Sequence, residues 1–541
     1  MSQSALTLKD RIHQLLKECY HILSEAGLAS ISEMIENSEK RLMQPMQLAI
    51  IGKISSSKST LVNAILGHPE VVRTGQMEET FNVSWLKYGD SDSDINVIFK
   101  DGRISSVPRE QWAKWASHQE KNVLKEQVKY IEVFYNHEIL KDINIIDTPG
   151  LDALSQIDSK NTILFLKEVQ PDAVVMLFTK SIAESTLSVL QDFQNVGTGD
   201  FNLSALNAIG VLSKADTIWS AMEPEKDIIS IGNRVIKTTL YDKYPEVRKS
   251  LFSILPVSSL IGLSSFTIND SDYSSLKALS LVDDTILLEM LSSPDFFFDE
   301  EYSIDVESTE RQRLYNKFGL YGIYIIIESL RRNEDANVVF LSDVLKEKSG
   351  FGKFLLTVQS HFGKRSTLIK SQSILQRILN EINKAKQIHV GVEYNAIAQA
   401  ENLIVAALLS LHEYKEWEYL AKYYGGNLEL TVDEADEFIA LCGERGYSAS
   451  ERLRCDNTRT PSQLVEIATG RALYWQKQYN IFSIIEPEKA DFYKLLISSY
   501  NLLLIDIQKA VCEYTSAKET IERTAAFLGL NTFNYSKPAL S

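Results

Sequence analysis

Apolar residues recur at two different spacings along this 541-residue chain. Between residues 47 and 262, short apolar runs alternate with helical stretches, which predicts strands connected by helices. Several runs are continuously apolar, as expected for strands buried on both faces of a mostly parallel sheet. The predicted strands are 47–51, 81–88, 95–99, 128–135, 143–146, 173–178, 207–212 and 252–257.

Outside this region the apolar residues recur every three or four positions, which is the period of an amphipathic helix. Residues 6–45 read as helix, with a break expected at Gly27. A second helix starts at Ser366 with aliphatic residues seven apart and continues towards Tyr424, where Gly425 and Gly426 end it. Shorter helices are predicted at 432–444, 462–480 and 488–528.

These patterns predict an α/β domain with a doubly wound, mostly parallel sheet, together with a helical bundle built from both ends of the chain. We expect helices at 1–46 that pack with the bundle and an α/β domain at 47–365, carrying an insert at about 264–345. A helical segment follows at 366–530, with an irregular tip at about 425–460, and residues 531–541 form a loose tail.

Composition narrows the setting of the protein. The net charge is −16, so contact with nucleic acid or anionic lipid would need a local basic patch, and we expect no nucleic-acid partner. Four scattered cysteines fit a reducing cytosol. No signal peptide is expected, and no uninterrupted apolar run reaches the roughly 20 residues of a membrane span.

The first predicted strand leads into a loop that resembles a phosphate-binding loop. Gly52 to Ser59 fit G-x-x-x-x-G-K-[ST], except that Ser57 replaces the second glycine. Backbone N–H groups of such a loop, and the helix that begins near Ser59 and Thr60, surround a polyphosphate. Lys58 would reach the terminal phosphates, and the Ser59 hydroxyl would hold Mg²⁺. A plain helix cap is the alternative.

Two further motifs could complete the phosphate end. Asp147 closes a strand in the run Asp-Thr-Pro-Gly, where it could hold the Mg²⁺ shell, while the amide of Gly150 could bind the γ-phosphate. Pro-Gly is also ordinary turn chemistry. Thr80, in a polar loop before a strand, is a candidate ligand of Mg²⁺ and the γ-phosphate, a prediction that depends on the neighbouring motifs.

Two more strand ends indicate which base is bound. Lys214 and Asp216 follow the strand at 207–212, and a carboxylate there can accept both N–H groups of the guanine edge, a donor pair that adenine lacks. Ser258 and Ser259 follow the strand at 252–257, where a backbone amide could meet the guanine carbonyl. Five motifs in one order, each at a strand end, predict a guanine-nucleotide-binding P-loop domain using GTP or GDP and Mg²⁺.

With these residues in view, the chain resembles the dynamin superfamily. The run from Gly52 to Gly67, the spacing of Gly75 and Thr80, and the pattern from Phe318 to Gly322 are similar to bacterial dynamin-like proteins, including the mycobacterial isoniazid-induced ones. The resemblance covers roughly residues 45–380. It implies a GTPase whose N-terminal, 366–424 and 488–528 helices form an elongated stalk, with residues 425–460 at its tip.

The resemblance also implies a mechanism. Ser55 matches a P-loop serine that contacts the β–γ bridge region, Thr80 would orient the attacking water, and hydrolysis would be completed when two GTPase domains face each other. Position 151 is leucine, so no glutamine follows the aspartate motif. Together, Ser57, Ile54 and Ser213 depart from the family pattern, and we therefore predict slow basal turnover stimulated by self-association or by a partner.

Two function classes stay open. One is a membrane-remodelling GTPase that self-associates, works with a second dynamin-like chain, and touches lipid through arginines of the tip from a cytoplasmic position at the inner face of the membrane. The other is a GTP-regulated scaffold with little hydrolysis that serves a protein partner. The tip arginines could equally be structural, since acidic residues lie close by.

Overall fold

The computed structural model describes residues 7–53, 55–69, 71–72, 82–116, 127–150, 171–179, 207–244, 251–302, 304–333, 335–363, 365–424, 428–446 and 448–527, with Val169 and Val247. The chain divides into two compact units, Met1–Ile404 and Val405–Ser541. The division into domains that the sequence suggested, with a boundary at 365/366, stays a prediction.

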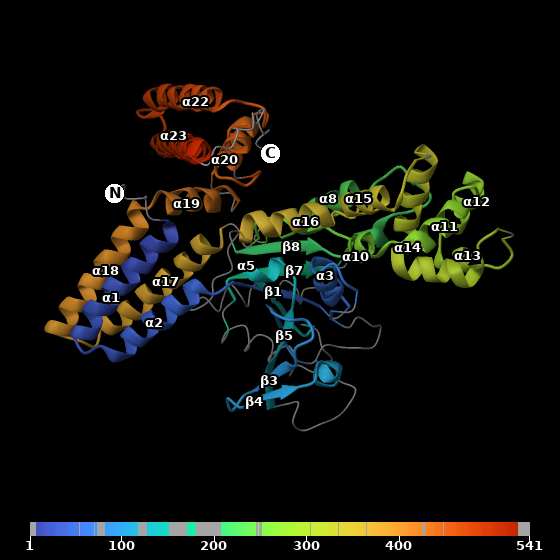
Figure 1. Ribbon diagram of the computed structural model, residues 1–541, viewed down its shortest axis with the longest axis horizontal. Helices are drawn as coiled ribbons and strands as arrows, with labels where there is room; N and C mark the ends of the chain where they lie inside the picture. Colours follow the sequence, from blue (N-terminus) through green and yellow to red (C-terminus); the bar gives the residue numbers. More distant parts are fainter. Residues whose placement is uncertain are drawn as a thin grey trace. The chain divides into compact units, whose positions relative to one another are not determined.

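A sheet lies at the centre of the first unit (Figure 1). Among the described residues its order is β4-β3-β5-β2-β6-β1-β7-β8-β9. The strands are β1 (Met46–Gly52), β2 (Ser84–Tyr88), β3 (Ile95–Phe99), β4 (Ile104–Val107), β5 (Val128–Tyr135), β6 (Ile143–Asp147), β7 (Ala173–Phe178), β8 (Ala208–Leu212) and β9 (Ile254–Pro256).

The half of the sheet from β6 to β9 is parallel throughout, as expected for strands buried on both faces. β2 pairs with β5 in parallel but with β6 antiparallel, and β3 is antiparallel to both of its neighbours. The α/β fold with a mostly parallel sheet is therefore confirmed, with a mixed extension of β2, β5, β3 and β4 beyond β6. β4 was not predicted, because this four-residue edge strand is half serine.

Helices flank the strands of the sheet. Those around the parallel half are α3 (Lys58–Ile65), α5 (Ile139–Asp142), η3 (Ala215–Ile218), α8 (Ile228–Val235), the π-helix η4 (Ile236–Tyr241), α16 (Phe351–Thr357) and the π-helix η5 (Val358–Gly363). Beside the mixed extension lie η1 (Arg109–Gln111) and α4 (Trp112–Ala116). Ala49, Ile51, Ile146, Val174 and Met176 belong to one buried core cluster of the sheet.

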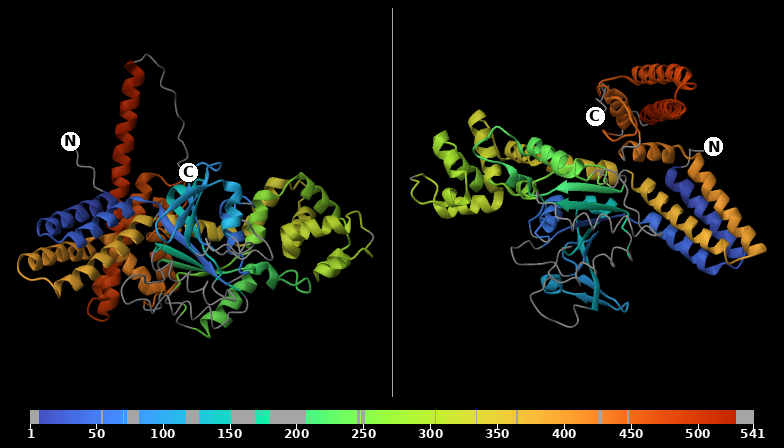
Figure 2. Two further views of the ribbon diagram at one scale, coloured as in Figure 1. Left: turned by 90° about the horizontal axis from the view of Figure 1, so that it is seen from below. Right: turned by 180° about the vertical axis from the view of Figure 1, so that it is seen from behind.

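A helical bundle is formed by the two ends of the first unit. It contains α1 (Leu8–Glu25), α2 (Ala29–Met43), α17 (Ser366–Lys386) and α18 (Val392–Ser410), which lie side by side in Figures 1 and 2. Gly27, at φ +80°, separates α1 from α2 as predicted. The single helix predicted from 366 to 424 is wrong, because α17 ends before Gly391, whose φ of +67° is incompatible with a continuous helix.

Buried charges join this bundle to the sheet. Arg41 of α2 donates to Asp172 at 3.1 Å, and the same carboxylate accepts from the backbone N–H of Gln47 at 2.8 Å. Lys370 of α17 donates to the carbonyl of Leu42 at 3.1 Å, and burial lowers the pKa of this lysine to about 8. The start of β1 is thereby held to both bundle helices.

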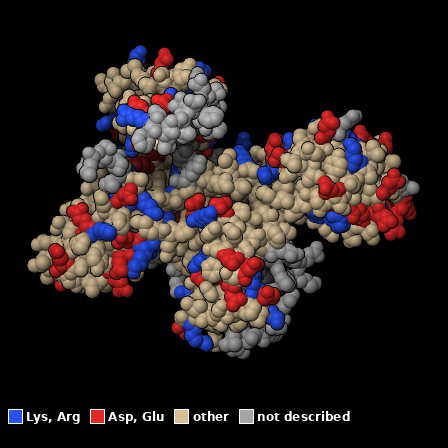
Figure 3. All heavy atoms as spheres, in the orientation of Figure 1, with Lys and Arg blue, Asp and Glu red and all other residues tan. Residues whose placement is uncertain are grey.

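Six helices between Ser259 and Lys348 form a segment that we call the helical insertion. They are α10 (Ser259–Thr267), α11 (Asp270–Leu279), α12 (Asp284–Met290), α13 (Pro294–Phe298), α14 (Ser308–Arg332) and α15 (Val338–Lys348). Its core cluster also includes Ala215 and Ala221, which follow β8. Acidic side chains gather at its outer end (Figure 3), where Asp295, Glu300 and Glu301 are exposed.

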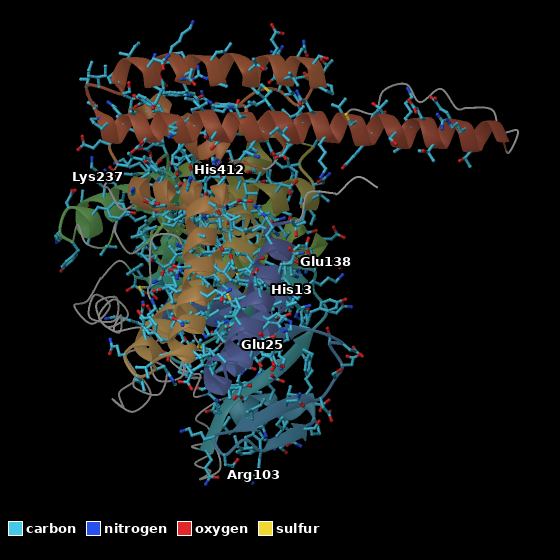
Figure 4. The ribbon with its side chains drawn as sticks, turned by 90° about the vertical axis from the view of Figure 1, so that its left-hand side faces the viewer. His13, Glu25, Arg103, Glu138, Lys237 and His412 are labelled. Carbon is cyan, nitrogen blue, oxygen red and sulfur yellow. The ribbon has the colours of Figure 1, made fainter. Side chains whose placement is uncertain are left out.

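The second unit contains α19 (His412–Tyr424), α20 (Val432–Leu441), α21 (Ala449–Arg452), α22 (Pro461–Phe482) and α23 (Pro487–Phe527). α22 and α23 form a hairpin, and α23 extends well beyond the start of α22 (Figure 4). Within α23, Lys489–Thr524 is long and apolar enough to cross a membrane by length and composition alone, which differs from the sequence expectation. A buried core helix passes the same test, and a third of its apolar window is buried.

The predicted tip, residues 425–460, belongs to this unit, and three of its arginines bind groups within the unit. Arg454 pairs with Asp436 at 2.9 Å, Arg445 pairs with the same carboxylate, and Arg452 donates to the carbonyl of Leu441 at 2.8 Å. Glu437 is buried and accepts from Arg471, Trp475 and Tyr500. These contacts favour the structural interpretation of the tip arginines over lipid binding.

Candidate functional site

Those predicted site residues that the structure describes lie at one edge of the sheet. β1, β6, β8 and β9 belong to its parallel half, so their carboxyl ends lie on the same side. β1 ends at Gly52, β6 at Asp147, β8 at Leu212 and β9 at Pro256, directly before or within the motifs that the sequence indicated. This is the edge at which open α/β sheets bind ligands.

The loop after β1 has the backbone geometry of an anion cradle. Ser57, the residue before α3, is left-handed at φ +66° and ψ +30°, and Ser55 also has a positive φ of +59°. Where residues of right-handed and left-handed backbone conformation follow one another, their backbone N–H groups point to one side of the loop and can bind an anion. Ser57, which replaces the second glycine of the pattern, thus stands at a left-handed position, where a serine costs roughly 1–2 kcal/mol.

Lys58 is the first residue of α3, and its side chain folds back over this loop. Its Nζ donates to the carbonyls of Gly52 at 3.2 Å and Lys53 at 2.9 Å, and only 7% of the residue is exposed. Burial lowers the pKa of Lys58 to about 8, although nearby Asp147 opposes the shift. Burial therefore destabilises the charged ammonium, and a phosphate bound beside it would compensate for the lost solvation.

Asp147 and Ser59 form the second part of the phosphate end. The Ser59 hydroxyl donates to Asp147 Oδ2 at 3.1 Å, whereas Oδ1 is buried and has no hydrogen-bond partner. Burial raises the pKa of Asp147 to about 6, against the opposing effects of Lys58 and Ser59. The Ser59 hydroxyl and the Asp147 carboxylate, one of whose oxygens has no partner in the part of the chain that the structure describes, fit Mg²⁺, which binds oxygen ligands.

The base end is built after β8. Ser213 is tied to the neighbouring strand, since its hydroxyl and its N–H donate to the carbonyl of Phe178 at 2.9 and 2.8 Å. Lys214 is left-handed at φ +54° and exposed, and its backbone turns the chain into η3. Asp216, in η3, is partly buried, and this burial raises its pKa despite a hydrogen bond from Ser258. The structure thus brings two of the predicted base-binding motifs together.

Ser258 and Ser259 lie at the start of α10. The buried Ser258 hydroxyl caps that helix by accepting from the N–H of Ile261 at 3.3 Å. Its own N–H donates to the carbonyl of Ser349 at 2.9 Å, a contact that the sequence analysis missed. In the sequence, the only sign of this contact is the adjacent Gly350. The structure gives this glycine a φ of +73° and brings it so close to Pro256 that a Cβ would lie 2.2 Å from the Pro256 carbonyl oxygen.

Some predicted positions cannot be placed. Thr80, Ile54 and Leu151 lie outside the described residues. Gly150 is described and buried directly beyond β6, and Thr60 lies in the first turn of α3, as expected for a residue close to the phosphates. Thr148, also buried, donates to the carbonyl of Ile50 at 2.8 Å and so ties the aspartate motif to β1. The site residues themselves stay predictions as ligands.

The parallel half of the sheet and the loop after β1 agree with a comparison to known families, in which residues 48–214 match the model of the Dynamin family. Residues 48–214 form a dynamin-like domain. The resemblance inferred from the sequence is confirmed.

Relatives of this dynamin-like chain are distant in sequence. It is 26% identical over 443 residues to isoniazid-induced protein IniC of Mycobacterium tuberculosis, covering 81% of this chain and 86% of that one. Dynamin-like protein 2 of Campylobacter jejuni is 29% identical over 216 residues, 39% of this chain and 32% of that one. A solved chain of an oligomerised bacterial dynamin pair is similar over 98% of this chain and 95% of that one, at 15% identity and with a TM-score of 0.34.

Proposed function

We propose that this dynamin-like chain binds and hydrolyses GTP with Mg²⁺. The observation that supports it best is the orphaned Asp147 Oδ1 beside Ser59, at the same sheet edge as Asp216. Ser59 and Asp147 would hold Mg²⁺, which neutralises charge on the phosphates. Lys58, Gly52, Ser57 and Thr60 would surround the phosphates, while Lys214, Asp216, Ser258 and Ser259 would bind guanine.

Ser55, Lys58 and Thr80 are the proposed catalytic residues. Ser55 is exposed on the phosphate loop, so its hydroxyl can meet the bridge between the β- and γ-phosphates. The carbonyls that Lys58 contacts must release it before it can bind a γ-phosphate. Together with the left-handed Ser57, this supports slow basal turnover that rises when two GTPase domains associate.

The exposed position of Ser55 also supports self-association as the activating step, because a second domain could exclude water from it. Action at a membrane, at its cytoplasmic face, is carried over from the dynamin family. Lipid contact through residues 425–460 has the weakest support, since Arg445, Arg452 and Arg454 already bind groups of their own unit. A second dynamin-like chain is the proposed protein partner.

The alternative, a GTP-regulated scaffold with little hydrolysis, is favoured by one observation. The serine at the left-handed position 57 places a side chain where the P-loop pattern has only hydrogen, and this could permit binding while slowing chemistry.

Turnover at different protein concentrations separates the two functions. We expect the specific GTPase rate to rise at least threefold over a hundredfold range of concentration, and to rise further with anionic liposomes. A GTP-binding protein whose rate stays flat and near zero with and without liposomes would be the scaffold. Absence of GTP binding would contradict both.

A further inference from the structure

Helix α14 of the helical insertion is broken in its middle. Gly319 has φ +64° and ψ +170° inside Ser308–Arg332. This combination of angles is open essentially to glycine alone, and such outliers concentrate at functional sites. α14 contains no proline, so the break comes from Gly319 itself.

The break faces the residue that is proposed to recognise the base. A Cβ built on Gly319 would lie 3.6 Å from Asp216 Oδ2 and 3.8 Å from Leu260 Cδ2. Asp216 also receives a hydrogen bond from Ser258. The carboxylate therefore has the start of α10 and the broken turn of α14 as neighbours.

Contacts on both sides hold the break in place. Before it, the Ser264 hydroxyl of α10 donates to the carbonyl of Lys317, an acceptor that an unbroken helix would use internally. The Lys317 ammonium donates to the carbonyl of Thr267 at 2.6 Å and to Asp272 at 2.5 Å. After it, a Cβ at Gly322 would lie 3.3 Å from Ile261 Cγ1, so this turn packs tightly on α10.

Aromatic rings connect the second half of α14 to the segment that follows Asp216. Trp219 stacks on Tyr324 with ring centroids 4.9 Å apart and an interplanar angle of 30°, and it also meets Tyr321 at 5.6 Å. η3, which carries Asp216, is thus fixed between β8 and α14.

We infer that Gly319 is a positioning residue for Asp216, and that the broken turn of α14 makes the helical insertion one wall of the guanine pocket. This inference rests on the proposed guanine-nucleotide binding. A Cβ at position 319 would be in van der Waals contact with Oδ2, and the positive φ would force the turn out of its glycine-only conformation and so move the surroundings of the carboxylate. Hydrogen bonding to the guanine 2-amino group, which needs a correctly placed carboxylate, would weaken first.

Fluorescent GDP and IDP distinguish this role from a general structural one, because hypoxanthine lacks the 2-amino group. For Gly319→Ala we expect GDP affinity to fall about tenfold, while IDP affinity changes less than about threefold. Gly322→Ala is the matched control in the same helix. It should lower the melting temperature through crowding but leave the GDP to IDP ratio unchanged.

If the ratio of GDP to IDP affinity is unchanged in Gly319→Ala, because both affinities stay the same or fall equally, the inference is overturned. If that variant does not fold, hydrogen exchange in the wild type replaces it: amides 319–324 should be protected by GDP and not by pyrophosphate, and no difference would overturn it. The wild type failing to bind GDP, or Asp216→Ala keeping the GDP preference, would reject guanine binding itself. A preference lost in Asp216→Ala but kept in Gly319→Ala rejects only the role of Gly319.

Discussion

The two ends of the proposed nucleotide site differ in how far their polar groups are satisfied before a ligand binds. At the phosphate end, two buried charged groups lack, among the described residues, a partner of opposite charge at hydrogen-bond distance: Asp147 Oδ1 has no hydrogen-bond partner, and Lys58 donates only to backbone carbonyls. The backbone of Ser57 beside them is strained by its positive φ. At the base end, Ser213 and Ser258 are hydrogen-bonded to their neighbours, and Asp216 is enclosed by packed helices. The phosphate end therefore needs a charged ligand to satisfy its groups, whereas the polar groups of the base end are already in position without a ligand.

This difference follows from the chemistry of each half of the ligand. Phosphates and Mg²⁺ supply strong compensating charges, so the protein can leave its own charges uncompensated until they bind. A neutral base offers only hydrogen bonds, whose net value is small unless the partners are already in position. Variants at the two ends should therefore fail in different ways.

Loss of the Lys58 ammonium should have the largest effect. Lys58→Ala removes the positive charge that faces the terminal phosphates, and we expect at least about a hundredfold loss of affinity for GTP, GDP and ITP alike. Nucleotide titration by fluorescence measures it. Lys87→Ala, which removes a lysine paired with Glu132 elsewhere in the sheet, is the control and should bind normally. Tight binding by Lys58→Ala would show that the loop is no phosphate site.

A change at the base end should alter selectivity instead. Asp216→Asn exchanges an acceptor for a donor, so we expect GTP affinity to fall roughly tenfold to a hundredfold while XTP, whose base carries a carbonyl in place of the amine, gains. Competition between the two nucleotides gives the ratio directly. Equal losses for GTP and XTP would mean that Asp216 supports the fold and does not read the base.

The pH dependence of the phosphate end gives a third test. The pKa of Asp147 is raised to about 6, so its favourable contribution to stability is complete below about pH 4 and is lost as the pH rises through 6. We expect the ligand-free melting temperature to fall between about pH 4 and 6, and Mg²⁺ with GDP to restore it. Asp147→Asn should abolish both effects, and a wild-type profile in that variant would contradict the assignment.

The sequence was sufficient for whatever depends on local pattern. β3, β5 and β7 begin and end at the predicted residues 95–99, 128–135 and 173–178, because continuous or alternating apolar runs define them. The motifs at Gly52, Asp147 and Asp216 were found because each follows such a run. The α/β fold and the dynamin resemblance both came from this information.

What escaped prediction depends on contacts between distant segments. The glycine-only conformation of Gly319 and the bond from Ser258 N–H to Ser349 arise where the helical insertion packs on the sheet edge. Periodicity cannot show them, since a glycine in an apolar stripe reads as continuous helix. β4 and the break at Gly391 escaped for related reasons, one being short and polar and the other a single turn residue.

The smallest predicted effect compares two serines of one loop. Ser57→Gly and Ser55→Gly each relieve a positive φ, at +66° and +59°, so each should raise the free energy of unfolding by about 0.5–1 kcal/mol. Only Ser55 carries a hydroxyl with a proposed catalytic role. Thermal melts should therefore move together, whereas GTP turnover should rise slightly in Ser57→Gly and fall at least tenfold in Ser55→Gly. If turnover instead fell in Ser57→Gly, this serine would be serving the phosphates directly, and the departure from the glycine pattern would be a functional feature.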